Sequence, residues 1–196
     1  AAADTDAKGE RSAQGRTGRA KAAEGQSSDG GAKGAVTPVK NQAQCGSCWA
    51  CSTTGSLEGA HFVELGKLIS FSEQELVSCS SSAGNHGCQG GIMDNAFNWI
   101  NQNGIVHEST YPYTSGGGNS GKCNTKGKTQ VKNVISGHTD VQSTDAALQA
   151  AVKKHPTSIA VDAGSGWHCL FTPSDAAHAG SRATTGVGRA LYHNTP

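Results

Sequence analysis

Apolar residues recur at helical spacing along residues 48–65, which predicts the first long helix. Its rough apolar stripe consists of Trp49, Leu57, Ala60 and Leu65. Gly46 and Ser47 precede the stripe as a cap, and Gly66 follows it as a stop. We therefore expect Cys48 in the first turn of this helix, with its thiol facing outward.

Two shorter helices follow. Residues 72–75 have the pattern of a capping box, which opens a helix to about Cys79. Residues 93–103 predict a third helix, with Phe97 and Ile100 directed inward and Gly104 at its end. Residues 116–121 are rich in glycine and predict a flexible loop.

The second half of the chain contains strand patterns. Residues 131–137 predict a strand, residues 145–153 a helix and residues 158–163 a buried strand. The helix has its apolar positions at Ala147, Leu148, Ala151 and Val152. Helices that come first and strands that come later are typical of an α+β fold.

Composition narrows the class of protein. The net charge of +1 gives no excess of positive charge that would favour binding to nucleic acid or to a membrane surface. No apolar run is long enough to span a bilayer. A length of 196 residues suits one domain or two small lobes. Residues 1–31 lack aromatic residues and a periodic apolar pattern, so we expect them to be flexible. No signal peptide opens the sequence, which predicts a processed or partial form.

Residues 41–50 contain the candidate chemistry. A thiol attacks a carbonyl as the thiolate, and a helix N-terminus favours negative charge on Cys48. The side-chain amide of Gln42 is a candidate donor to the developing oxyanion, beside the backbone N–H of Cys48. One such donor typically lowers the barrier by ~3 kcal/mol.

The run Cys45-Gly46-Ser47-Cys48-Trp49 resembles the nucleophile segment of the papain family of cysteine peptidases. Similar stretches cover residues 34–52, 70–79, 87–97 and 109–116. The run GGIMDNAF is similar to the cathepsin L-like branch. The resemblance implies a two-lobe α+β fold, with a helical lobe, a β-barrel-like lobe and the active-site cleft between them.

The resemblance also implies catalytic partners for Cys48 and Gln42. His178 lies 130 residues after Cys48 and Asn194 lies 146 after it, within the expected interval of about 130–150 residues. His178 would act as the base and Asn194 would orient it, with His193 and His168 as competing candidates for the base. For the other five histidines we expect solvation at the surface: His61, His86, His107, His138 and His155.

By the same resemblance, Cys45 pairs with Cys88 and Cys79 with Cys123, which leaves Cys48 free. Seven cysteines suit an oxidising compartment. Cys51 is expected to be a small buried hydrophobic residue at a position where the family usually has a bulky one. Cys169 is a candidate for half of a third disulfide, and a bridge between Cys51 and Cys169 is not favoured.

The expected domain organisation follows the family. Residues 1–22 form a flexible N-terminal extension, and residues 23–196 form the peptidase domain. Within that domain the helical lobe covers about residues 40–130 and the β-rich lobe about residues 131–196. The family has a longer segment after the catalytic Asn, so we expect the C-terminal part of this domain to be incomplete.

The implied activity is cleavage of peptide bonds by a Cys-His thiolate mechanism, without a metal or other cofactor. The backbone of Gly90 and Gly91 would pair with an extended peptide, and Ile92, Met93 and Ala160 would line an apolar S2 pocket. Ordinary lobe packing is the alternative for Ile92 and Met93. The expected partners are peptide or protein substrates and protein inhibitors or a propeptide. We expect a monomer that binds neither nucleic acid nor membrane and resides in a lysosome, a vacuole or outside the cell.

Two other functions fit parts of the pattern. A homologue that kept the fold and Cys48 without catalysis would serve as a binding or structural protein. A redox module would use Cys45 and Cys48 as a C-x-x-C pair, but Trp49 follows the pair, whereas a thioredoxin-type site has its Trp before it. The spacing of the remaining cysteines disfavours an iron–sulfur cluster and a zinc site.

Overall fold

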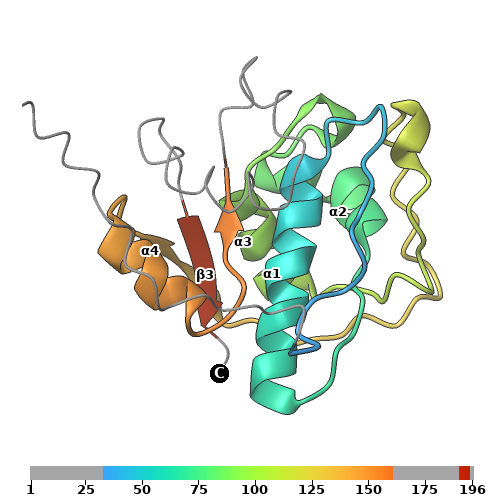
Figure 1. Ribbon diagram of the computed structural model, residues 1–196. Helices are drawn as coiled ribbons and strands as arrows, with labels where there is room; N and C mark the ends of the chain where they lie inside the picture. The colour runs from blue at the N-terminus through green and yellow to red at the C-terminus, as the bar shows by residue number, and fades with distance from the viewer. Residues whose placement is uncertain (1–32, 161–189, 195–196) are drawn as a thin grey trace, which may run out of the picture.

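The computed structural model describes residues 33–160, together with the backbone of residues 190–194 (Figure 1). Helix α1 (Cys48–Leu65) runs through the middle of the molecule. Helices α2 (Glu73–Cys79) and α3 (Met93–Asn103) both contact α1. Helix α4 (Asp145–Val152) and a small sheet lie on the other side of α1 from α2. This arrangement is the expected α+β architecture.

Helix α1 has the bounds that the sequence predicts. Gly66 ends it in the left-handed conformation, at φ 68°, which a glycine adopts without steric cost. Trp49, Leu57 and Ala60 are buried as expected. The prediction for Leu65 was wrong, since this side chain is 70% exposed. Leu65 is the last residue of the helix and extends past the core that the other helices cover.

The caps of the other helices agree with the sequence. The Ser72 hydroxyl accepts a hydrogen bond of 3.0 Å from the backbone N–H of Glu75 and so begins α2. The Glu75 carboxylate accepts a bond of 2.7 Å from the N–H of Val106, which ties α2 to the segment after α3. Gly104 ends α3, with Phe97 and Ile100 in the core as predicted.

Three strands form an antiparallel sheet of order β1-β3-β2. They are β1 (Gly137–Val141), β2 (Ser158–Ile159) and β3 (Ala190–Asn194). In register, Gly137 faces Asn194 in β3 and Val141 faces Ala190. The outer face of β1 is covered in part by α4, where Val141 and Ala151 form a small second core.

The predicted strand over residues 131–137 was wrong. Val131 forms one isolated bridge with Ile105, and Val134 and Ile135 are buried in the core of the helices. Asn133, between Val131 and Val134, has φ 56°, a left-handed conformation that interrupts an extended strand. The apolar pattern therefore predicted correctly that these residues are buried, but incorrectly that they pair as a strand.

The predicted strand over residues 158–163 begins at Ser158 as expected, while residues 161–163 lie outside the described residues. Ile159 is exposed rather than buried. Ser158 holds β2 against α1, since its hydroxyl donates to the Ser52 carbonyl at 2.8 Å. Gly59 permits this approach, because a Cβ there would lie 2.4 Å from Pro156.

The glycine-rich loop is anchored by polar contacts. Its start forms a 3-10 turn, Ser115–Gly117. The Ser120 carbonyl accepts a bond of 2.7 Å from Ser78, and the Ser120 hydroxyl accepts one of 2.8 Å from the N–H of Cys88. Among the described residues, no helix has the length and apolar character needed to cross a membrane.

Candidate active site

Cys48 is the first residue of α1, and its thiol is free and exposed. The turn before it is fixed by a chain of hydroxyl contacts. The Tyr113 hydroxyl donates to the Gln42 carbonyl at 3.0 Å, so Ser47, 2.7 Å away, is the donor to Tyr113. Ser47 itself is buried. These contacts hold Gln42 and the start of α1 on one phenol ring.

The disulfide between Cys45 and Cys88 secures the same turn from the other side. The N–H of Gly46 donates to the Cys88 carbonyl at 2.9 Å. A Cβ on Gly46 would lie 2.6 Å from that carbonyl oxygen, so only glycine fits this approach. Because Cys45 is bonded to Cys88, it does not pair with Cys48 as a redox module would require.

The second disulfide, Cys79–Cys123, is also the pair that the resemblance implies. It ties the end of α2 to the segment after the glycine-rich loop. The four bonded cysteines leave Cys48 and Cys51 as the free thiols among the described residues. Cys169 lies outside that part of the chain.

The double glycine, Gly90 and Gly91, lies against Trp49, the residue that follows Cys48. Trp49 is 2% exposed, and its indole N–H donates to the Gly87 carbonyl at 3.2 Å. A Cβ on Gly91 would lie 2.6 Å from the Trp49 ring, so the backbone there follows the ring closely. Gly90 uses its own N–H and carbonyl within the loop, bonded to Gly87 and His86.

The three candidate S2 residues have different environments. Ile92 is 52% exposed and is the N-cap of α3. Met93 is buried in the core of the helices, which agrees with ordinary packing of the lobe, the alternative to a place in the S2 pocket. Ala160 is exposed just beyond β2.

His178 and His168 lie outside the described residues. His193 and Asn194 belong to β3, of which the structure describes the backbone. In register, His193 faces His138 and Asn194 faces Gly137.

The described histidines are not all solvated, and the expectation was wrong for His61. Its side chain is 8% exposed, with Nδ1 2.8 Å from the Lys67 carbonyl and its ring edge against Phe71. His107 packs on the same phenyl ring. Only His86 is exposed among these five.

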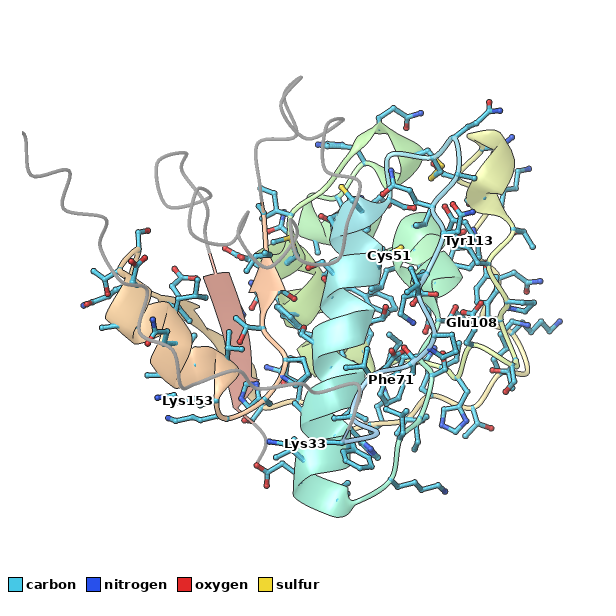
Figure 2. The ribbon with its side chains drawn as sticks, viewed as in Figure 1. Lys33, Cys51, Phe71, Glu108, Tyr113 and Lys153 are labelled. Carbon is cyan, nitrogen blue, oxygen red and sulfur yellow. A yellow bond between two sulfur atoms is a disulfide. The ribbon has the colours of Figure 1, made fainter. Side chains whose placement is uncertain are left out.

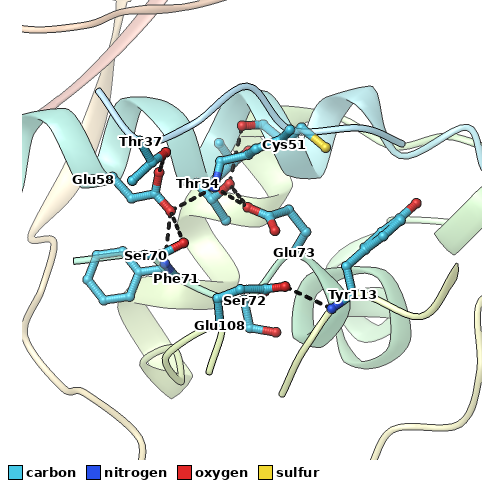
Figure 3. Close-up of polar contacts among 12 residues, drawn as sticks. Thr37, Cys51, Thr54, Glu58, Ser70, Phe71, Ser72, Glu73, Glu108 and Tyr113 are labelled. Atoms are coloured by element: carbon cyan, nitrogen blue, oxygen red, sulfur yellow. Dashed lines mark hydrogen bonds and ion pairs between the residues drawn. The ribbon is translucent and has the colours of Figure 1, made fainter. Parts of the chain in front are cut away.

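Sequence reasoning missed a buried polar cluster beside α1 (Figure 3). The Lys40 ammonium lies 2.9 Å from Glu58 and 2.7 Å from Glu73. Glu58 is fully buried and also accepts a bond of 2.8 Å from the N–H of Phe71. Burial alone would lower the pKa of Lys40, but Glu73 and Glu58 raise it overall. These residues are far apart in sequence, so no local pattern could have identified the cluster.

A cavity of about 240 Å³ borders this cluster, and Cys51 and Glu108 are among the residues that line it. Both residues are labelled in Figure 2. Burial, followed by the charge of Glu73, raises the pKa of Cys51 to about 11. Cys51 is therefore half-buried in a polar setting, rather than a hydrophobic residue in the core. Burial also raises the pKa of Glu108 to about 7, although the backbone N–H of Tyr113 lowers it in part.

Comparison with known proteins agrees with this geometry. The model of the papain family of cysteine proteases matches residues 25–173. Cysteine proteinase 5 of Dictyostelium discoideum is 47% identical over 147 residues, which cover 74% of this chain and 41% of that protein. Procathepsin L of Mus musculus is 50% identical over 133 residues, which cover 67% of this chain and 39% of that protein.

Solved structures give the same result. A Carica candamarcensis cysteine protease in complex with E-64 superposes with a TM-score of 0.63 at 34% identity, covering 70% of this chain and 63% of that one. Digestive procathepsin L 3 of Tenebrio molitor superposes with a TM-score of 0.57 at 42% identity, covering 65% of this chain and 40% of that one.

Cys48 begins a long helix with a free, exposed thiol, its neighbour Cys45 is bonded to Cys88, and Gly91 lies against Trp49. This arrangement is that of a candidate cysteine-nucleophile site. The chain belongs to the papain family of cysteine proteases, in its cathepsin L-like branch. It spans about two fifths of the length of these two curated relatives.

Proposed function

We propose that this protein is a cysteine endopeptidase with Cys48 as its nucleophile. The observation that supports this most is the state of the two cysteines in the motif. Cys45 is consumed by a disulfide, whereas Cys48 is free and exposed at the N-terminus of α1. A helix N-terminus is a position that stabilises an anion, such as the oxyanion that would form beside Cys48.

The reaction proceeds through an acyl-enzyme. His178 takes the proton of the Cys48 thiol, and the thiolate attacks the peptide carbonyl carbon. The C–N bond then breaks as the imidazolium protonates the leaving amine, which leaves a thioester on Cys48. Water, deprotonated by the imidazole, hydrolyses the thioester and returns the thiol. Asn194 orients the imidazole, as the third member of a triad does.

The oxyanion is stabilised by two donors, the side chain of Gln42 and the backbone N–H of Cys48. Cys48 is the first residue of α1, so its N–H has no acceptor within the helix. Gln42 lies on the turn that Tyr113 holds through the Gln42 carbonyl, which leaves its side-chain amide available. Removal of one such donor typically costs ~3 kcal/mol of barrier.

Substrate binds as an added strand along the double glycine. Gly91 is the pairing residue of the two, because the polar backbone groups of Gly90 are bonded within their own loop. The exposed side chain of Ile92 offers the P2 residue an apolar contact, and Met93 and the exposed Ala160 are the other apolar candidates for this pocket. We therefore expect preference for an apolar residue at P2.

The partners and location follow from the relatives. Two of them are named as procathepsins, and the Carica protease was solved with E-64. We propose protein substrates, a propeptide and protein inhibitors as partners of a monomeric enzyme that binds neither nucleic acid nor membrane. Two disulfides suit a lysosomal, vacuolar or extracellular location.

The test is hydrolysis of fluorogenic dipeptide substrates that differ only at P2, with Leu, Phe or Arg. We expect the Leu and Phe substrates to be cleaved faster than the Arg substrate, by about 10-fold or more, since one apolar contact is worth ~1–3 kcal/mol. Cys48→Ala should abolish cleavage, and Cys51→Ala, the matched control, should preserve it.

Single alanine variants of His178, His168 and His193 identify the base. Loss of kcat in the His178 variant alone supports the assignment, and loss in another variant transfers the role to that residue. A folded protein that cleaves none of the substrates would favour the non-catalytic homologue.

A further inference from the structure

Three side chains that can bind metal converge where α3 meets β1. They are Asp94 in the first turn of α3, and His138 and Asp140 in β1. One ligand atom from each lies within 4.8 Å of the other two. Asp94 belongs to the run GGIMDNAF, but the site residues that the resemblance implies and the proposed peptidase reaction include none of the three.

The backbone brings these side chains together. His138 and Asp140 are two residues apart in a strand, so their side chains leave the same face of the sheet. Helix α3 packs against β1, and its first turn supplies Asp94. Phe97, one turn later, stacks on the His138 ring with the centroids 5.7 Å apart and the planes at 26°. The phenyl ring thus holds the imidazole plane in place.

We propose that Asp94, His138 and Asp140 form a binding site for a divalent transition-metal ion, of which Zn²⁺ is the best fit. One imidazole and two carboxylates are ligands that Zn²⁺ takes readily. Ligand atoms around a tetrahedral Zn²⁺ are about 3.4 Å apart, so the three atoms, which lie within 4.8 Å of one another, need to approach by at most about 1.4 Å. Three protein ligands leave the fourth position to water.

The bound ion is structural. It links the start of α3 to β1 and so joins the helical core to the sheet. Helix α3 begins directly after Gly91 and Ile92, so the ion also stiffens the wall beside the candidate active site. This inference does not depend on the peptidase activity. Without metal, the same three residues would be polar neighbours at the contact between α3 and β1.

The test measures metal binding in the Cys48→Ala background, which removes the exposed thiol as a competing ligand. Co²⁺ is the spectroscopic probe, because its visible bands report nitrogen and oxygen coordination, and Zn²⁺ is added as the competitor. Thermal unfolding with and without Zn²⁺ gives a second readout. His138→Gln and Asp140→Asn remove ligands, and His86→Gln is the matched control, since His86 is an exposed imidazole.

We expect the Cys48→Ala chain and its His86→Gln variant to bind Co²⁺ with equal affinity and to rise in Tm with Zn²⁺. His138→Gln and Asp140→Asn should each weaken binding by at least about 10-fold and reduce the Zn²⁺-induced rise, since even outer-shell partners are worth 10–100-fold. Comparing the Tm of each variant with and without Zn²⁺ separates a loss of metal binding from a loss of folding stability. Equal Co²⁺ affinity in all variants, or no binding in any, would overturn the proposed site.

Discussion

Replacement of Lys40 by Met should destabilise the fold strongly, because it removes the cation shared by two buried carboxylates. Lys40 lies 2.9 Å from Glu58 and 2.7 Å from Glu73, whose side chains are 0% and 5% exposed. Removal of one member of a buried ion pair typically costs 3–5 kcal/mol, and we expect a loss of about 4 kcal/mol near neutral pH. Small domains have only about 5–15 kcal/mol of stability, so the variant should be marginally folded.

The loss should depend on pH with a defined sign. In the variant the two carboxylates lack their cation, so the folded state takes up a proton that the unfolded chain does not hold near neutral pH. Stability then falls as pH rises, and the gap to the wild type should be smaller at about pH 5 than at about pH 8. Adding Glu73→Gln to the Lys40 variant should recover part of the loss, because one carboxylate becomes neutral.

Urea unfolding followed by the fluorescence of the buried Trp49 and Trp99 measures this, in the Cys48→Ala background to prevent self-cleavage. Lys67→Met is the control, since Lys67 is exposed and should change stability by less than about 0.5 kcal/mol. A Lys40→Met variant within about 1 kcal/mol of its parent at all pH values would refute the account of this cluster.

Because the pKa of Glu108 is raised from 4.5 to about 7, its contribution to stability should be present below pH 4.5 and lost as pH rises through about 7. The urea midpoint should therefore fall less over this pH range in Glu108→Gln than in the wild type. Cys51, with its pKa near 11, should be about 0.1% thiolate at pH 8, so mass spectrometry should find iodoacetamide on Cys48 long before Cys51. Gly46→Ala should lower Tm, with a loss of about 1–3 kcal/mol, because its Cβ would lie 2.6 Å from the Cys88 carbonyl; an unchanged Tm would contradict that close contact.

The helices could be predicted from sequence because their ends carry local chemistry. Ser72 caps α2 through its own hydroxyl, and Gly66 and Gly104 end α1 and α3 with positive φ. These signals lie within one turn of the boundary they set. The long helix and the third helix accordingly have the bounds that the sequence predicts.

The strands and the polar cluster depend on partners distant in sequence. Val134 and Ile135 are as apolar as strand residues, yet they fill the core of the helices, and the pairing strand begins at Gly137. Likewise, Glu58 appears as a polar residue on the predicted helix, and only the fold brings Lys40 to it. The sequence predicts that Val134 and Ile135 are buried. It does not predict which residues they pack against, nor that Lys40 is the partner of Glu58.

The central claim is that Cys48 is an activated nucleophile, and covalent labelling with an epoxysuccinyl inhibitor tests it most directly. After incubation near neutral pH, peptide mapping should find one inhibitor per chain on Cys48, formed far faster than on a free model thiol. Cys51→Ala should label equally, and Cys48→Ala should not label. Labelling of Cys48 no faster than the model thiol, in a folded protein, would contradict the account.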